Sequence, residues 1–157
     1  MEEIERKFLV SSLKFKKDAQ NSMMIVQGFL NTHPERTVRI RKQDHRAQIT
    51  VKGISSEDGL SRFEWEHEIS LPEADALLNL CESGLIEKRR YEVRAGEHIF
   101  EVDEFLGPNK GLIIAEIELE TKEEEFERPE WLGDEVTGDL KYYNSLLSKK
   151  PFESWNH

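Results

Sequence analysis

Charged and apolar side chains alternate with a period of two along much of this chain of 157 residues. Residues 61–70 give the most regular example, in which Arg62 and Glu64 fall on one side and Phe63 and Trp65 on the other. Successive side chains of a β-strand point to opposite faces, so such a segment is predicted as a strand with one charged and one apolar face. A chain built from these segments is expected to fold mainly as antiparallel sheet.

Eight segments fit this strand pattern: residues 3–8, 24–30, 37–43, 47–52, 61–70, 86–94, 98–105 and 112–121. The period changes after Pro72, where apolar side chains recur at helical spacing through Cys81, and this stretch is predicted as a helix. Residues 11–23 are expected to form a loop or a short helix, and residues 122–127 a solvated helix. Asp139 is expected to cap a final helix.

The charged faces of the predicted strands are sorted by sign. Some strands supply bases and others supply paired acids; the bases are Arg39, Arg41, Lys52, Lys88 and Arg90, and the acids are Glu3, Glu5, Glu64, Glu66, Glu116 and Glu118. A sandwich of two sheets would leave these charges in solvent and bury the apolar faces. A closed barrel would turn them inward, with Trp65 and Ile117 outside under helices. The sorting of the charges favours the barrel, and the sandwich is the alternative.

A charged barrel interior requires a charged ligand. Buried charges without partners are costly, so a lumen of both signs calls for a ligand with several negative charges together with a divalent cation. An oligophosphate with Mg²⁺ or Mn²⁺ meets both requirements, because Mg²⁺ typically takes one or two carboxylates plus waters and phosphate oxygens. The opening strand fits this chemistry, since Glu3, Glu5 and Lys7 share one face while Arg6 points away.

The overall charge limits the partners. The chain has 22 Lys and Arg against 32 Asp and Glu, so its formal net charge is 22 − 32 = −10. This charge opposes nonspecific binding to nucleic acid or to an anionic membrane. The single Cys81 cannot form an internal disulfide, and no apolar run resembles a signal peptide or a membrane span. We therefore expect one cytoplasmic domain over residues 1–157, with no nucleic-acid and no membrane partner.

The motifs, in their order along the chain, resemble the CYTH superfamily, the triphosphate tunnel metalloenzymes. The opening segment matches the Glu-x-Glu-x-Lys signature of that family. The match continues through TVRIR (37–41), TVKG (50–53), RFEWE (62–66), EKRRY (87–91), FEVDEF (100–105), AEIELE (115–120) and EVTGDLKYYN (135–144). The resemblance spans nearly the whole chain. It implies an α+β fold in which a closed eight-stranded antiparallel β-barrel forms a tunnel with a charged interior, and helices pack outside.

The resemblance also implies roles for individual residues. The residues expected to grip the triphosphate are Lys7, Arg39, Arg41, Lys52, Lys88 and Arg90, with Arg62 as a further candidate. The expected metal ligands are Glu3, Glu5, Glu116 and Glu118, with Glu64, Glu66 and Asp103 contributing directly or indirectly. Three members of these sets, Lys7, Lys52 and Glu5, are expected to take part in catalysis.

The short bacterial members that this chain most resembles hydrolyse inorganic tripolyphosphate. The expected activity is therefore hydrolysis of this small molecule to pyrophosphate and phosphate, with Mg²⁺ or Mn²⁺ as cofactor. The alternatives within the family are a thiamine or nucleoside triphosphatase and a class IV adenylyl cyclase. A noncatalytic polyphosphate-binding module is disfavoured, because metal ligands add little to simple anion capture. The oligomeric state, monomer or homodimer, is left open.

Overall fold

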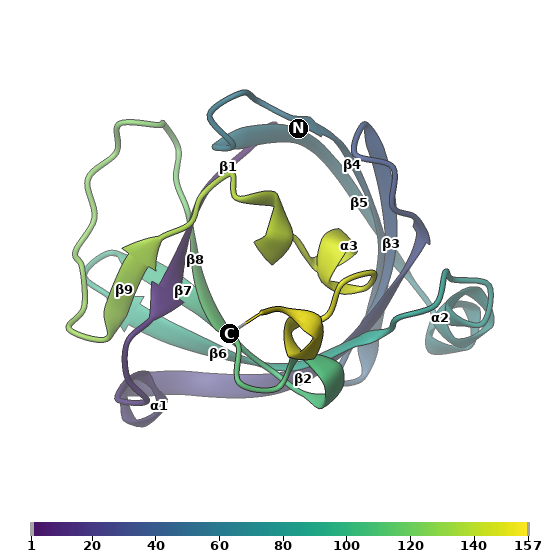
Figure 1. Ribbon diagram of the computed structural model, residues 1–157, viewed down its shortest axis with the longest axis horizontal. Coiled ribbons are helices and arrows are strands. Elements are labelled where there is room, and N and C mark those ends of the chain that lie inside the picture. The colour runs from purple at the N-terminus through teal and green to yellow at the C-terminus, as the bar shows by residue number, and fades with distance from the viewer. Residues whose placement is uncertain (1, 157) are drawn as a thin grey trace.

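A closed barrel of eight antiparallel strands forms the body of the protein (Figure 1). The structure is a computed structural model that describes residues 2–156. The barrel strands are β1 (Glu2–Val10), β2 (Ala19–Asn31), β3 (Arg36–Gln43), β4 (Arg46–Ser55), β5 (Ser61–Ile69), β6 (Ile86–Ala95), β7 (His98–Phe105) and β8 (Ile113–Glu118). A short strand outside the barrel, β9 (Leu132–Glu135), pairs with β1. The eight predicted strands and the closed barrel are thus confirmed.

The N-terminal strand β1 closes the barrel. Residues 2–4 pair with residues 61–63 of β5, and residues 5–9 pair with residues 114–118 of β8. The complete order around the barrel is β1, β5, β4, β3, β2, β6, β7 and β8. Because β1 joins β5 on one side and β8 on the other, the opening Glu-x-Glu motif lies where three strands meet.

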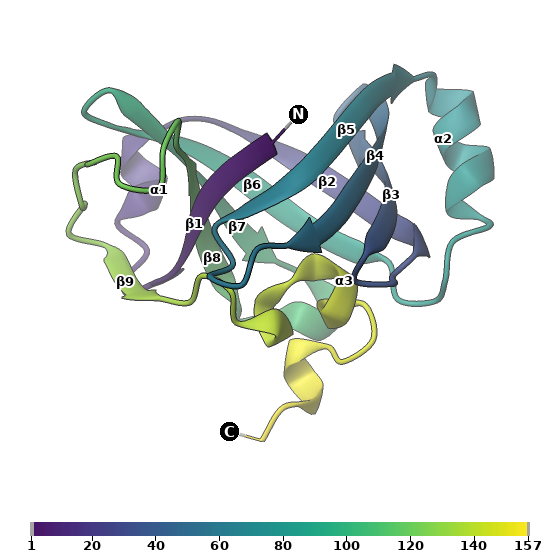
Figure 2. The same ribbon diagram turned by 90° about the horizontal axis from the view of Figure 1, so that it is seen from above.

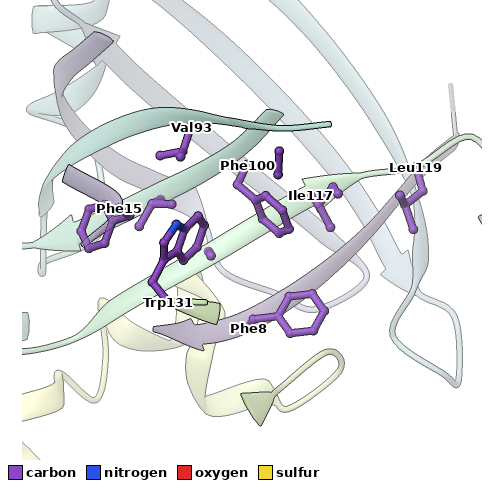
Figure 3. Packing of buried hydrophobic residues seen from close by; sticks show 10 residues of the cluster. Phe8, Phe15, Val93, Phe100, Ile117, Leu119 and Trp131 are labelled. Atoms are coloured by element: carbon purple, nitrogen blue, oxygen red, sulfur yellow. The ribbon is translucent and has the colours of Figure 1, made fainter. Parts of the chain in front are cut away.

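The apolar outer faces of the strands are covered by segments that lie outside the barrel wall. The larger cover packs on β1, β6, β7 and β8, where Phe8, Phe15, Val93, Phe100 and Trp131 are buried together (Figure 3). Phe15 comes from α1 (Phe15–Asp18) and Trp131 from the segment that follows β8. Ile117 is buried in the same cluster, so its side chain points out of the barrel as predicted.

A second cover is the helix α2 (Leu71–Leu78), which packs on β2, β3 and β4. Ser70 and Glu73 form a capping box at its first turn, each side chain accepting a hydrogen bond from the other's backbone N–H. Its buried Ala74 contacts the cluster that contains Ile40 and Ala47. Figure 2 shows α2 standing beside the barrel wall.

The C-terminal segment covers one end of the barrel. It contains η2 (Leu140–Tyr142), α3 (Asn144–Leu147) and η3 (Phe152–Ser154), and it lies across the opening in Figure 1 and below the strands in Figure 2. Tyr142 and Leu147 pack there in one cluster with Phe29, Ile86, Phe105 and Leu112. At this end the barrel interior is therefore apolar and filled, and the charged part of the lumen begins above it.

Three predictions outside the barrel were wrong or incomplete. Residues 11–23 contain the short helix α1, but β2 begins at Ala19, because pairing with β6 extends the strand beyond its apolar run. Residues 122–127 form turns and irregular structure instead of a helix. Asp139 caps only the 3₁₀ turn η2, which is followed by the one-turn helix α3. Short segments held by tertiary contacts need no long amphipathic repeat.

None of the helices formed by residues 2–156 has both the length and the apolar character needed to span a membrane.

Candidate active site

The charged part of the lumen contains two connected cavities. One, of about 80 Å³, lies at the end covered by the C-terminal segment, and the other, of about 310 Å³, lies toward the opposite mouth. Residues lining both cavities include Glu3, Glu5, Arg39, Arg41, Lys52, Arg90 and Glu116. The shared lining shows that the two cavities meet in the middle of the barrel. They form one tunnel whose walls come from six or more strands far apart in sequence.

The acidic wall is built by the pairing of β1 with β8. Glu5 lies directly opposite Glu118, and Lys7 lies opposite Glu116. On the next strand, Glu101 of β7 lies opposite Glu116. Side chains that face each other across an antiparallel pair approach closely, and like charges there are destabilising. The register therefore brings the two Glu-x-Glu motifs, Glu3 with Glu5 and Glu116 with Glu118, into one patch of mutually repelling carboxylates, the acidic wall.

Burial disfavours the ionised form of two carboxyl groups of this patch, Glu3 and Glu5, whereas Lys7 and other bases lower the pKa of Glu116. Desolvation, together with a hydrogen bond to Glu64, raises the pKa of Glu3 to about 7 although Lys52 opposes the shift. Desolvation and the charge of Glu116 raise the pKa of Glu5 well above its usual range. Lys52 near Glu3, and Lys52 and Lys7 near Glu5, do not supply enough positive charge to offset this effect of burial on the pKa. A cation at this position would supply that charge.

The donor set of the acidic wall fits a hard divalent cation. Its members carry carboxylate oxygens, which Mg²⁺ and Mn²⁺ prefer. Within residues 2–156, no three acidic, histidine or cysteine side chains converge as a finished coordination sphere. A cation would therefore take one or two carboxylates of the wall and complete its coordination with waters and substrate oxygens, which is the usual manner of Mg²⁺.

Two arginines of β3 face the tunnel with unused hydrogen-bonding capacity. Arg39 donates from its terminal nitrogen Nη2 to Thr50 Oγ1 at 3.0 Å, but its buried Nε has no hydrogen-bond partner in the part of the chain that the structure describes. Arg41 donates from Nε to Gln27 Oε1 at 2.8 Å. An unpaired buried guanidinium N–H is unfavourable, so its presence in a tunnel wall indicates a place for an anionic ligand.

The basic strand β6 contributes Lys88 and Arg90, which share one carboxylate. Asp103 accepts from Arg90 Nε at 2.8 Å and Nη2 at 2.9 Å, and Lys88 Nζ lies 2.7 Å from its Oδ2. Burial lowers the pKa of Lys88 to about 7, with Asp103 acting in the opposite direction. Both oxygens of Asp103 are thus engaged, and Asp103 does not line either cavity. The geometry supports an indirect role for it, holding the two bases in place.

The remaining three bases are Lys7 on β1, Lys52 on β4 and Arg62 on β5. Lys52 Nζ lies 3.1 Å from Glu3 Oε1 and 3.8 Å from Glu64 Oε2. Lys7 Nζ lies 3.9 Å from Glu116 Oε1, and Arg62 donates to the carbonyl of Gly53 at 2.9 Å. These bases line the tunnel beside the acidic wall. A ligand between the two walls would therefore contact both signs of charge at once.

The covered end of the tunnel is formed by the C-terminal segment. The Tyr143 ring lies beneath two bases, with its centroid 4.6 Å from Lys7 Nζ and 5.8 Å from Arg62 Cζ. Its hydroxyl is 3.1 Å from Ser55 Oγ. Gly59 and Gly138 pack so closely that a Cβ on Gly59 would lie 2.3 Å from Gly138 Cα. These contacts fix the segment against the barrel.

The structure brings together nearly all residues that the sequence predicted for the site. The tunnel is lined by Glu3, Glu5, Lys7, Arg39, Arg41, Lys52, Arg62, Glu64, Glu66, Lys88, Arg90, Glu116 and Glu118, and Asp103 lies behind two of them. Several polar residues in or beside the tunnel were not among the predicted site residues. Glu101, two positions before Asp103, was detectable from the strand period, and Gln27 as the polar residue of an apolar run. Tyr143 and Asn144 lie in short irregular structure that carries no periodic signal.

A closed antiparallel barrel whose lumen has opposed acidic and basic walls defines a class of protein that holds a multivalent anion beside cations. Comparison of the sequence with known families identifies the particular family. Residues 1–149 match the CYTH domain model, and the chain belongs to that family.

Individual relatives cover almost the same length. An inorganic triphosphatase of Acetivibrio thermocellus is 44% identical over 154 residues, which is 98% of this chain and 97% of the relative. One from Nitrosomonas europaea is 36% identical over 152 residues, or 94% and 97% of the two chains. A solved structure of an inorganic triphosphatase superposes with a TM-score of 0.66 and 31% identity, covering 93% of each chain.

Proposed function

We propose that the protein hydrolyses inorganic tripolyphosphate to pyrophosphate and phosphate inside the barrel, with Mg²⁺ or Mn²⁺ as cofactor. The observation that carries this proposal is the meeting of basic and acidic walls in one tunnel, where Arg39 and Arg41 face Glu3, Glu5 and their neighbours. The description of two full-length relatives as inorganic triphosphatases supports the same substrate.

The basic residues act on the phosphate oxygens. In phosphoryl transfer the reacting group spreads negative charge over its oxygens, and catalysis consists largely of positioning and of electrostatic stabilisation. We assign Arg39, Arg41, Lys88, Arg90 and Arg62 to hold the phosphate chain. Lys7 and Lys52 stand closest to the acidic wall, so we assign them to neutralise the charge that develops between attacking and leaving oxygens.

The acidic residues act on the other side of the reacting phosphate. We assign Glu3, Glu5, Glu116 and Glu118 as cation ligands, with Glu64 and Glu66 at the wider mouth as additional contributors. The bound divalent cation would polarise phosphate oxygens and lower the pKa of a water molecule. Glu5 faces Glu118 across the strand pair, and we assign it to orient the attacking water.

The test is a comparison of substrates and metals. Phosphate release is measured from tripolyphosphate, ATP and thiamine triphosphate, each with Mg²⁺, with Mn²⁺ and with a chelator, and the ATP reaction is examined for cyclic AMP. We expect rapid, metal-dependent release from tripolyphosphate, with pyrophosphate and phosphate in equal amounts. Faster turnover of an organic triphosphate would replace the substrate assignment. Tight tripolyphosphate binding without turnover under any condition would identify a binding module instead.

A further inference from the structure

We propose that Gln27 and Asn144 form an amide bridge that positions Arg41 and Lys88 for the phosphate chain. This inference rests on the proposed function, since it assigns positioning residues to the same tunnel. Neither amide belongs to the acidic or the basic wall. Gln27 comes from β2 and Asn144 from α3, so the bridge joins the barrel wall to the C-terminal segment.

Three hydrogen bonds form the bridge. Gln27 Oε1 accepts from Arg41 Nε at 2.8 Å, and Gln27 Nε2 donates to Asn144 Oδ1 at 2.7 Å. The same Asn144 oxygen accepts from Lys88 Nζ at 2.8 Å. The two cations, which stand on separate strands β3 and β6, are thus connected through two amides. A displacement of either amide would change the direction of both cations.

Burial makes this connection rigid. Gln27 is 0% exposed and Lys88 is 1% exposed, so both side chains are shielded from bulk water. Buried amide groups must be hydrogen-bonded, and each hydrogen bond to a charged group contributes more than one between neutral groups. The network is therefore held in one arrangement before a ligand enters.

The neutrality of the amides explains why they stand here in place of carboxylates. A carboxylate beside Arg41 would pair with the guanidinium and cancel the charge that attracts phosphate. An amide oxygen accepts the same hydrogen bond and orients the guanidinium. Because the amide is neutral, the positive charge of the guanidinium remains available to the substrate. Lys88 already shares Asp103 with Arg90, so a second carboxylate near Lys88 would neutralise it further.

The bridge is tested by removing each amide without changing side-chain volume greatly. The variants are Gln27→Met, Asn144→Leu and the double variant. We expect each single change to raise KM for tripolyphosphate about tenfold, the size expected from losing a hydrogen bond to a charged group. The double variant should lose little more than the worse single variant, because residues that act as one unit are not additive.

Asn109 provides a matched control. It is also a buried asparagine, 3% exposed, and its Oδ1 accepts from the backbone N–H of Phe152 at 2.8 Å, so it too anchors the C-terminal segment. Asn109→Leu should lower the melting temperature and leave KM unchanged. A bridge that served only folding would behave like Asn109, lowering kcat through a smaller folded fraction at constant KM.

Equilibrium binding of tripolyphosphate in chelator, measured by calorimetry, separates this inference from the proposed function. We expect the bridge variants to bind about tenfold more weakly than the wild-type protein under these conditions. Unchanged KM and Kd in folded variants, or additive losses in the double variant, would overturn the bridge. Absence of turnover by the wild-type protein would refute the proposed function, while the binding comparison would still decide for or against the bridge.

Discussion

Arg90 and Asp103 form a two-point ion pair inside the barrel, with Nε donating to Oδ1 at 2.8 Å and Nη2 donating to Oδ2 at 2.9 Å. The two residues are directly opposite each other on β6 and β7. Lys88, also on β6, reaches the same carboxylate. A single acid therefore sets the direction of two of the bases that we assign to the substrate.

Removal of this carboxylate should destabilise the protein strongly. Asp103→Ala leaves Arg90 and Lys88 buried without their shared partner, and breaking a buried pair in this way costs about 3–5 kcal/mol. The free energy of unfolding, measured with urea, should fall by this amount. Asp75→Ala removes an ion pair with Lys42 on the surface and should change the same quantity little. Equal effects of the two changes would contradict the role given to Asp103.

Loss of Arg39 should affect activity far more than stability. Its buried Nε has no hydrogen-bond partner among residues 2–156, so Arg39→Ala removes a group that is unsatisfied until a ligand binds. We expect kcat/KM for tripolyphosphate to fall by about 10²–10³, the range seen when one electrostatic contact to a transition state is deleted. The melting temperature should be unchanged or higher.

Arg89 is the control for the arginine experiment. It lies between Lys88 and Arg90 on β6, but its side chain points outward and contacts Ser22. Arg89→Ala should keep kcat/KM within about twofold of wild type, since it leaves the tunnel charge in place. A comparable loss in both arginine variants would show that total charge, and not the wall of the tunnel, governs the rate.

Repulsion between the facing carboxyl groups of Glu5 and Glu118 should lower the stability of the metal-free protein. Glu5→Gln removes one of two carboxylates that face each other across the strands, so the melting temperature in chelator should rise. Turnover should fall by roughly a hundredfold or more, because Glu5 is one of the proposed cation ligands. Added Mg²⁺ or Mn²⁺ should stabilise the wild type but stabilise this variant much less. Glu87→Gln, on the outer face of β6, should respond to metal as the wild type does.

Two glycines separate backbone strain from the docking of the C-terminal segment. Gly59 has φ +76°, and a Cβ there would meet Gly138 Cα at 2.3 Å, whereas Gly107 has φ +61° and open space around it. Gly107→Ala should cost only the left-handed conformation, about 1–2 kcal/mol. Gly59→Ala should cost more and should also raise KM, because it displaces the segment that carries Tyr143. Unfolding and steady-state kinetics of both variants give the comparison.

The sequence was sufficient for the barrel because the strand period reports directly on the faces of a sheet. Lys7 and Glu116 were assigned to one lumen from the alternation and the family motifs, and the register places them opposite each other. The segment that covers one end was not predictable in this way. Asn144 and Tyr143 act through contacts with distant strands, and a one-turn helix leaves no repeat in the sequence.

The start of β2 shows a second limit of sequence reasoning. Residues 20–22 are polar and exposed, yet they form strand because β6 offers them a hydrogen-bonding edge. The acidic residues 122–127 have the composition of a solvated helix, but Phe126 is held against Phe8 and Phe100, so the segment follows the barrel surface. In both cases contacts with residues distant in sequence outweighed the local secondary-structure propensity.

In the charged part of this barrel, the two sides of each strand serve different ends. Along β1 the inward Lys7 lines the tunnel, where we propose that it acts on the substrate, while the outward Phe8 packs the wall against its covering segment. A scan of substitutions along such a strand should therefore give losses of catalysis and losses of folding at alternate positions. Engineering for thermal tolerance can proceed through one set of positions while selection for new substrates proceeds through the other, with little interference between them.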